Sequence, residues 1–464
     1  MTVWRRYIST HVPRKKVSII GSGPAGFYTA YHLLSKSPVP LDVTIWEKLP
    51  VPFGLSRYGV APDHPEVKNC EETFTDCARK FSSHSEKHHF EFVGGIEIGK
   101  QIKLAQLLEN QDAVILSYGC NGDRYLGIPG EQGTKGVFSS RQFVNWYNGH
   151  PSVAMDPEFT NFNWSGVRNV GIIGNGNVAL DIARILLSNR IDELWKHTDV
   201  STIALNCLRK APIHNVKIIG RRDFLHSKFT NKELREMWQL EKYGIRGNIS
   251  REYFSENMFD LGSHDRAFKR RVEMCSEYLK PFDQRTKKNF KKSVPPPRTQ
   301  EDRQWKLDYL KSPLKIEKDN YTNRIQSLTL SHNLLTEDNR LIVDPNGKEV
   351  TYNLDLLITS LGYAGVPLPE FSELDIAFEK GHISNEQGRV LNNDGDLFPG
   401  LYASGWIRKG SQGVIASTMQ DSFEVADRVI QDLLQPPRYI YERKRTVDID
   451  LSGTPHTTWA DWEK

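Results

Sequence analysis

Two glycine-rich stretches hold residues whose spacing suits the binding of a diphosphate. In the first, Gly21, Gly23 and Gly26 form a G-x-G-x-x-G pattern within residues 15–34, after an apolar run and before a helical pattern. The first glycine permits a tight turn, the second lets the backbone approach a pyrophosphate, and the third lets a helix pack closely on a strand. Free N–H groups and a partial positive charge at the start of that helix would attract the phosphates.

An acidic residue completes the first pattern. The next apolar run, residues 41–48, carries Glu47 near its end. A carboxylate about 20 residues after the glycines can accept hydrogen bonds from the hydroxyls of an adenosine ribose. The glycines alone are a weak signal, because such turns are common. A strand before them, a helix after them and an acid in place favour a dinucleotide site.

The second stretch repeats this arrangement. Gly174, Gly176 and Ala179 occupy the three positions within residues 168–187, again after an apolar run and before a helical pattern. Alanine at the third position predicts slightly looser packing of the helix on the strand. Two nucleotide sites in one chain suggest that one dinucleotide passes a hydride to the other, since simple binding more often needs only one site.

The strand expected to read the second ribose, residues 215–223, carries Arg221 and Arg222 where an acid would stand. Two guanidiniums can bind a 2′-phosphate through bidentate hydrogen bonds, whereas an acid would repel it. We therefore interpret the second site as one for NADPH and the first as one for FAD. The alternative is that the two arginines are a solvated strand end. The connection of about 30 residues before this strand is longer than usual and weakens its assignment.

These elements predict an α/β fold with two Rossmann-like dinucleotide-binding domains, since 464 residues are too many for one compact core. Residues 354–363 are expected to form a buried strand from which the chain crosses back to the first domain. We expect a discontinuous FAD-binding domain at residues 17–121 and 362–464. The NADPH-binding domain, residues 122–361, would be inserted into it.

Composition excludes several classes of function. A net charge of +4 over the whole chain gives no domain-wide excess of Lys and Arg, so nucleic-acid binding is not expected. The five cysteines form no C-x-x-C pair and no metal-ligand spacing, so we expect no metal or iron–sulfur site and no redox dithiol. No apolar run approaches the roughly 18 residues that a transmembrane helix needs.

Basic residues gather in two places. Residues 1–16 are rich in Arg and Lys, contain hydroxyl residues and precede the first acid, Asp42, which is typical of a mitochondrial presequence; a disordered basic tail is the alternative. A second group lies on an expected helix and could dock an acidic protein or be a solvated face. This group consists of Arg266, Lys269, Arg270 and Arg271.

Further motifs extend the pattern along the chain. They are VPFGLSRYGVAPDHPEVKN (51–69), VILSYG (114–119), NWYNGHP (145–151), GNGNVALDIAR (174–184), IIGRRD (218–223) and YASGWIRKGSQGVIASTM (402–419). With these motifs the chain closely resembles the NADPH:adrenodoxin reductase family over essentially its whole length, nearest to the fungal mitochondrial members. Family members continue past the stretch that matches residues 457–464 with a charged tail, whereas this sequence ends there.

The resemblance implies a mitochondrial flavoenzyme that takes a hydride from NADPH and passes single electrons to an acidic [2Fe–2S] ferredoxin. The matrix, or the matrix face of the inner membrane, is the implied location. Iron–sulfur cluster, haem A and ubiquinone synthesis are the implied uses of the electrons. Oligomeric state and peripheral membrane attachment stay open.

The resemblance also assigns roles to residues at matching positions. His64 and Asp181 are placed near the flavin for proton handling, although His64 as an ordinary structural histidine is an alternative. Besides the glycines, the implied FAD contacts are Ala25, Glu47, Leu55, Ile98, Trp406, Gly413, Val414 and Ile415. The implied NADPH contacts are Gly174, Asn175, Gly176, Asn177, Arg221, Arg222, Glu233 and Gly413.

Cysteine usage separates this family from its relatives. Reductases of the thioredoxin or glutathione type need a dithiol beside the flavin, and glutamate-synthase-like subunits carry cysteine clusters; the chain has neither. A flavin monooxygenase remains an enzymatic alternative. A protein that senses both dinucleotides without turnover is an alternative of a different class.

Overall fold

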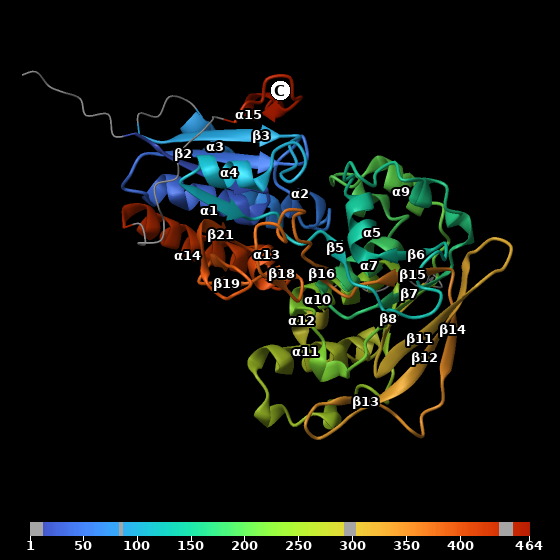
Figure 1. The fold of residues 1–464 in the computed structure, drawn as a ribbon. Coiled ribbons are helices and arrows are strands. Elements are labelled where there is room, and N and C mark those ends of the chain that lie inside the picture. The colour runs from blue at the N-terminus through green and yellow to red at the C-terminus, as the bar shows by residue number, and fades with distance from the viewer. Residues whose placement is uncertain (1–12, 83–86, 292–302, 436–448) are drawn as a thin grey trace, which may run out of the picture. The chain divides into compact units, whose positions relative to one another are not determined.

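The computed structural model describes residues 13–82, 87–291, 303–435 and 449–464. The chain forms two compact units. Unit 1 consists of Met1–Val60, His64–Gly122 and Tyr363–Lys464, and unit 2 consists of Ala61–Asp63 and Asp123–Gly362. The predicted α/β class with a second nucleotide-type domain inserted into the first is confirmed (Figure 1).

An eight-stranded, mostly parallel sheet forms the centre of unit 1. Strand β4 lies on the opposite side of β1 from β2, so the strand order reverses at β1. Ligands of such sheets bind outside the carboxyl ends of the strands at this reversal. In spatial order the strands are β19 (Asn385–Glu386), β20 (Arg389–Leu391), β21 (Leu397–Ala403), β4 (Ala113–Leu116), β1 (Lys15–Ile20), β2 (Leu41–Glu47), β3 (His89–Gly94) and β22 (Thr457–Thr458).

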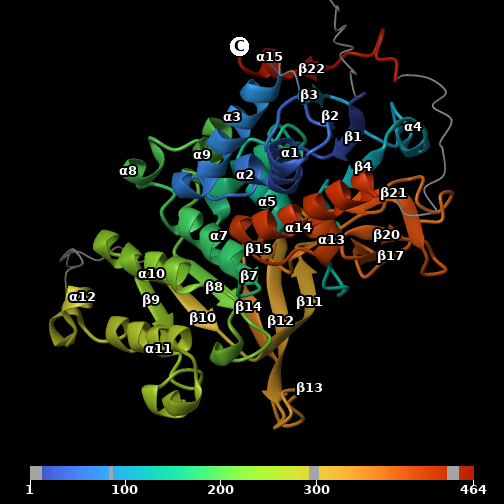
Figure 2. The same cartoon turned by 90° about the vertical axis from the view of Figure 1, so that its left-hand side faces the viewer.

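Both faces of this sheet are buried, as expected for parallel strands. Residues of β1 enter different cores: Val17 and Ile19 pack with α1, α3 and α14, whereas Ile20 packs with α4 and the segment around Phe371. Figure 2 shows α1 and α14 side by side. The helices are α1 (Pro24–Lys36), α2 (Leu55–Tyr58), α3 (Cys70–Ser82), α4 (Leu104–Asn110), α13 (Trp406–Lys409), α14 (Ile415–Leu434) and α15 (Trp459–Trp462).

A six-stranded parallel sheet forms the centre of unit 2. Its order also reverses, because β15 and β8 flank β7 on opposite sides. The strand assigned from Arg221 and Arg222 is β8, and its pairing with β7 confirms that assignment. In spatial order the strands are β6 (Val137–Ser139), β15 (Leu356–Thr359), β7 (Asn169–Ile173), β8 (Asn215–Ile219), β10 (Gln304–Asp308) and β9 (Arg246–Ile249).

Two different layers cover the six-stranded sheet. Its helices share a large core with one face, and α8 (Asp192–Trp195) and α9 (Thr202–Leu208) occupy the long connection before β8. The longer ones are α5 (Ser140–Tyr147), α7 (Asn177–Leu187), α10 (Asn231–Gln239) and α11 (Arg266–Tyr278).

The other face packs on an antiparallel sheet, which we call the accessory sheet. Its buried residues Ile316, Leu328 and Leu330 share a core with Ile173 of β7 and Ile219 of β8. The accessory sheet therefore supports the strand that leads to the arginine pair. Its strands are β11 (Lys311–Lys318), β12 (Ile325–Leu335), β13 (Leu341–Val343) and β14 (Val350–Asn353).

The expected presequence, residues 1–16, lies largely outside the described residues. Its last two residues are part of β1. Lys15 forms an ion pair of 3.2 Å with Asp112, and the Lys16 amide donates to the same carboxylate at 2.8 Å. Among the helices of the described residues, none is long and apolar enough to cross a membrane.

Candidate functional site

The first glycine turn of unit 1 lies where the strand order reverses. Gly21 has a φ of +104°, and a β-carbon on it would lie 2.6 Å from the Tyr118 Cα. Tyr118 follows β4, the strand on the far side of the reversal. Only glycine permits both the backbone conformation and this approach.

The two other glycines of the motif have different surroundings. A β-carbon on Gly26 would collide with the Gly21 carbonyl oxygen, so Gly26 allows α1 to pack on the turn. A β-carbon on Gly23 would meet nothing within 4 Å. Gly23 is the N-cap of α1, and no side chain caps that helix. The helix start is therefore open to a phosphate, which its N–H groups and dipole would bind.

Glu47 fixes the turn from the end of β2. One of its carboxylate oxygens accepts from the Ser22 amide at 2.9 Å and from the Ser22 hydroxyl at 2.7 Å. The other accepts from the Leu49 amide at 3.0 Å. A carboxylate has about four acceptor sites, so Glu47 keeps capacity for a ribose hydroxyl.

The P-F-G-L stretch lies against the same turn. The Phe53 amide donates to the Ser22 carbonyl at 3.0 Å, and a β-carbon on Gly54 would lie 3.0 Å from the Gly23 Cα. Leu55, which begins α2, is half-buried beside this contact. Ile98 is different, because it is only 3% exposed and packs inside the core under α4.

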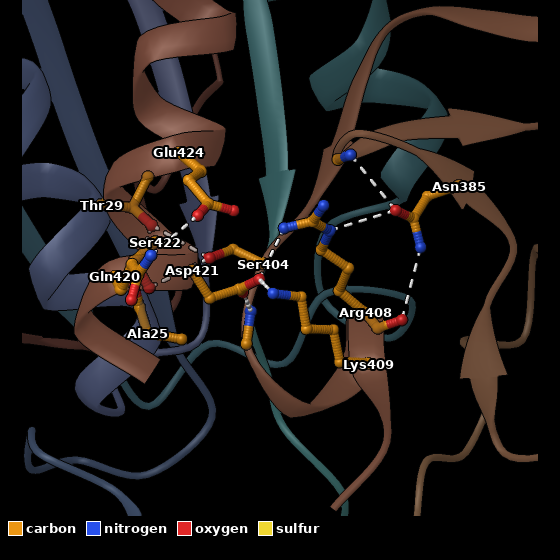
Figure 3. A network of polar contacts seen from close by, with 12 residues as sticks. Ala25, Thr29, Asn385, Ser404, Arg408, Lys409, Gln420, Asp421, Ser422 and Glu424 are labelled. Carbon is orange, nitrogen blue, oxygen red and sulfur yellow. Dashed lines mark hydrogen bonds and ion pairs between the residues drawn. The ribbon is translucent and has the colours of Figure 1, made fainter. Parts of the chain in front are cut away.

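Asp421 joins the Gly405 segment to α14. Gly405 approaches α1 so closely that a β-carbon on it would collide with the Ala25 side chain. The buried Asp421 carboxylate accepts from the Gly405 amide at 2.7 Å and from the Arg408 guanidinium at 2.5 Å. Figure 3 shows the side chains of Arg408 and Lys409 directed toward Asp421. Lys409 forms a third contact of 2.7 Å. These contacts fix the backbone that leads into Trp406, which is half-buried.

The residues just before α14 are exposed. Gly413 has a φ of +87°, and Val414 is 56% exposed. Ile415 begins the helix, and Thr418 in its first turn lies 3.8 Å from where a β-carbon on Gly405 would stand. The start of α14 is thus brought to the glycine turn of unit 1.

The glycine turn of unit 2 repeats this geometry. Gly174 has a φ of +119°, and a β-carbon on it would collide with the Ser360 carbonyl after β15. Gly176 is the N-cap of α7 and faces open space, since a β-carbon on it would meet nothing within 4 Å. This turn therefore also offers an open helix start to a phosphate.

Hydrogen bonds at Asn175 and Asn177 connect this turn to the segment that leads into α10. The Asn177 side-chain oxygen accepts from the Thr230 amide at 2.8 Å, and the Asn175 carbonyl accepts from the Lys228 amide at 3.0 Å. The Thr230 hydroxyl in turn contacts the Glu233 carboxylate. The structure thus brings Asn175, Asn177 and Glu233 together.

Arg221 and Arg222 follow β8 beside this turn. Arg221 is exposed and Arg222 is half-buried. Within the described part of the chain, neither guanidinium forms an ion pair or a hydrogen bond. The neighbouring Asp223 carboxylate is engaged by His226 at 2.6 Å. The two guanidiniums are therefore available to an anion.

Arg184, which the sequence did not single out, forms ion pairs with three carboxylates of unit 2, those of Asp63, Asp181 and Glu236. It is 4% exposed, binds Asp63 through two contacts of 2.6 and 2.9 Å, and binds Asp181 at 2.9 Å. Burial opposes its charge, but Asp181, Asp63 and Glu236 outweigh that effect and raise the pKa of Arg184. The ion pair gives Asp181 a structural role, whatever its role in proton transfer.

His64 is 7% exposed and is the N-cap of a short 3-10 helix, Pro65–Asn69. Its carbonyl accepts from the Val67 amide at 3.1 Å. His64 belongs to unit 1 and Asp181 to unit 2. Proton handling by this pair stays a prediction.

The basic residues near position 270 lie on α11, as expected, but they are not equivalent. Arg266, Lys269 and Arg270 are exposed. Arg271 donates to the carbonyls of Ser227 at 3.2 Å and Phe229 at 2.9 Å. Its guanidinium therefore serves the fold, and three residues remain as the exposed basic group.

All five cysteines lie in the described residues, and none forms a disulfide. Four of them are buried and Cys70 is half-buried. Burial raises the pKa of the Cys77 and Cys275 thiols to about 12. A thiol of such high pKa is a poor nucleophile at neutral pH.

Comparison with known proteins gives consistent relatives. The family described as pyridine nucleotide-disulphide oxidoreductase matches residues 15–250. A probable NADPH:adrenodoxin oxidoreductase of Saccharomyces cerevisiae is 68% identical over 99% of this chain and 92% of its own length. The human NADPH:adrenodoxin oxidoreductase is 37% identical over 99% and 88%. The solved structure of Mycobacterium tuberculosis FprA in complex with NADPH has a TM-score of 0.79 and 29% identity, over 97% of this chain and 93% of that one.

The open space at Gly23 and Gly176 allows binding to be separated from folding. We expect Gly23→Val to abolish retention of FAD, and Gly176→Val to weaken NADPH binding by about 100-fold or more, because each side chain would occupy the phosphate position. Both glycines have extended backbone angles that valine adopts. Flavin absorbance of the purified protein and titration with NADPH measure the two effects.

Thermal unfolding of the flavin-free proteins is the control for this pair. If the flavin-free variants unfold at a temperature low enough to explain their lost binding, the interpretation of these glycines as ligand positions is contradicted. Gly26→Val is the matched comparison and is expected to destabilise the fold itself, since its β-carbon would collide with Gly21.

Proposed function

The chain belongs to the NADPH:adrenodoxin oxidoreductase family, and from this membership we propose that it passes electrons from NADPH through FAD to a [2Fe–2S] ferredoxin. The observation that carries the proposal is that one chain contains two open glycine turns. A pair of arginines follows the strand beside the second turn. If electrons pass from NADPH to FAD, the lack of a C-x-x-C pair means that they leave for a separate acceptor.

We propose that FAD binds in unit 1. Gly23 and the start of α1 would hold the pyrophosphate, and Glu47 the adenosine ribose. The fit is supported by the uncapped helix start and by the spare acceptor sites of Glu47. The proposed contacts are Gly21, Gly23, Ala25, Gly26, Glu47, Leu55, Ile98, Trp406, Gly413, Val414 and Ile415.

We propose that NADPH binds in unit 2. Gly176 and the start of α7 would hold its pyrophosphate, and the arginine pair its 2′-phosphate. The absence of any carboxylate partner for Arg221 and Arg222 among the described residues supports this assignment. The proposed contacts are Gly174, Asn175, Gly176, Asn177, Arg221, Arg222 and Glu233, with Gly413 beside the nicotinamide.

Bound FAD supplies the conversion between a donor of electron pairs and an acceptor of single electrons. The chain's own residues would position the bound dinucleotides. Glu47 holds the turn that receives the pyrophosphate, and Asp421 holds the backbone at Gly405. The buried thiols present no disulfide that would divert the electrons. We propose that His64 and Asp181 handle protons, with Arg184 fixing the Asp181 carboxylate.

We propose that the protein works in the mitochondrial matrix, because its relatives in yeast and humans are named mitochondrial. A cleaved leader would have to end before Lys15, since β1 begins there and Lys15 pairs with Asp112. The uses of the electrons implied by the resemblance are iron–sulfur cluster, haem A and ubiquinone synthesis.

The function is tested by electron transfer with purified holoenzyme. We expect NADPH to bleach the flavin absorbance and to reduce cytochrome c only when a [2Fe–2S] ferredoxin is added. NADH should be a much weaker donor. Bleaching that no ferredoxin accelerates would refute the proposed acceptor and leave a flavin monooxygenase as the better interpretation, and binding without bleaching would indicate a sensor.

The arginine pair makes a separate prediction about coenzyme choice. Arg222→Ala is expected to raise the KM for NADPH by about 10- to 100-fold, since charge-assisted hydrogen bonds contribute about 1.5–3 kcal/mol each. The KM for NADH should change little, because NADH has no 2′-phosphate. Steady-state kinetics with both coenzymes measure this, and equal changes in the two KM values would disprove the assignment.

We propose that an acidic ferredoxin docks on the exposed basic group of α11. Reversing the charge of Arg266, Lys269 and Arg270 to Glu is expected to raise the KM for ferredoxin about 10-fold at low salt, and less at high salt. The kinetics of NADPH oxidation by ferricyanide should be unchanged.

A charge-matched control lies on β11 of the accessory sheet and on the turn between β12 and β13. Reversing Lys315, Lys318 and Arg340, which are also exposed, changes the net charge by the same amount. If both triple variants weaken ferredoxin binding equally, net charge and not α11 controls the association.

A further inference from the structure

The arginine loop, residues 220–222, is held by the segment that begins the accessory sheet. The Gly220 amide donates to the Asp308 carbonyl at 2.7 Å, and the Gly220 carbonyl accepts from the Lys311 amide at 3.2 Å. The Arg222 carbonyl accepts from the Leu310 amide at 3.3 Å. All of these bonds join backbone atoms, so no side-chain substitution removes them directly.

Among the described residues, one side chain also anchors this loop. The Asn333 amide nitrogen donates to the Arg221 carbonyl at 2.9 Å. Asn333 lies on β12, 112 residues further along the chain, and is 3% exposed. Its second amide hydrogen goes to the Ser312 hydroxyl at 2.8 Å, and its backbone amide donates to the Leu310 carbonyl at 2.8 Å.

The segment that carries these donors is itself rigidly supported. Lys311 and Asp308 form an ion pair of 2.7 Å, with side chains 4% and 1% exposed. The Tyr352 hydroxyl on β14 donates to the other oxygen of Asp308 at 2.6 Å. A buried pair with its remaining hydrogen bonds satisfied has little freedom to rearrange. Residues 308–311 are therefore a fixed base for the arginine loop.

The side chains of Arg221 and Arg222 have no such support. Neither guanidinium forms a hydrogen bond or an ion pair within the described residues, so no protein partner there orients either one. Their direction depends on the backbone from which they extend. Bidentate binding of a phosphate requires both position and orientation. A shift of the Arg221 peptide would therefore change how the pair meets an anion.

We propose that Asn333 is a positioning residue for coenzyme choice: through the Arg221 carbonyl it aims the arginine pair at the 2′-phosphate of NADPH. The accessory sheet thereby gains a function in specificity. This inference rests on the proposed 2′-phosphate site at Arg221 and Arg222. It adds a residue that touches no part of the coenzyme.

The test uses two fragments that differ only in the 2′-phosphate, 2′,5′-ADP and 5′-AMP. Calorimetric titration of the FAD-loaded enzyme gives the dissociation constant of each. Asn333→Leu, which keeps the approximate size and removes the donor, is expected to weaken 2′,5′-ADP about 5- to 10-fold, as loss of one hydrogen bond implies. Binding of 5′-AMP should change by less than about two-fold.

Two further variants control the experiment. Ser312→Ala removes the other partner of the same Asn333 amide and should leave the preference for 2′,5′-ADP at the wild-type value. Asn333→Thr suits a strand but is too short to reach the Arg221 carbonyl, and it should reproduce the loss if Asn333→Leu does not fold. An equal loss for both fragments would indicate a merely structural role and would overturn the proposal.

A double-mutant cycle decides whether Asn333 acts through the arginines. In an Arg221→Ala, Arg222→Ala background, Asn333→Leu should have no further effect on 2′,5′-ADP; additive losses would overturn the proposal. If the arginine variant loses the preference and Asn333→Leu keeps it, the positioning role is wrong and the 2′-phosphate site stands. If the arginine variant keeps the preference, the proposed 2′-phosphate site itself is wrong.

Discussion

The approach of each glycine turn to the neighbouring strand is the constraint on which both units depend. Gly21 lies against Tyr118 after β4, and Gly174 lies against Ser360 after β15. In each case the partner follows the strand on the far side of the order reversal. A larger residue would push the strand ends apart there, and the helix that follows would no longer begin at the carboxyl edge of its sheet.

The two units use one backbone geometry with different charges around it. In unit 1 the carboxylate of Glu47 closes the turn and is already bonded to Ser22. In unit 2 two arginines follow the corresponding strand, and neither guanidinium has a protein partner among the described residues. The glycine turns can hold any diphosphate, so the choice between dinucleotides falls to these few side chains.

How far the sequence predicted the structure depends on the range of each interaction. The strands around the two glycine turns, the turns themselves, the inserted second unit and the placement of β8 beside β7 follow from local patterns, and the structure agrees with them. The accessory sheet was not predicted. Arg184, Asp421 and Asn333 were missed, because each binds a group outside its own helix or strand. Arg184 had a weak signal in its spacing of three from Asp181, but Asn333 stands in an ordinary strand pattern with none. Conversely, Arg271 belongs to a basic run, and only the fold shows that its guanidinium is occupied by two carbonyls.

The missed residues share a physical role. Asp421 binds the Gly405 amide, Arg184 binds Asp63 and Asp181, and Asn333 binds the Arg221 carbonyl. Each is almost fully buried. In a medium of low polarity such bonds are stronger than in water, and leaving a partner unsatisfied costs about 1–3 kcal/mol. The first glycine turn has its own anchor in Ser22, which donates to Glu47. The Gly405 segment and the arginine loop instead depend on buried polar groups of other elements, Asp421 on α14 and Asn333 on β12.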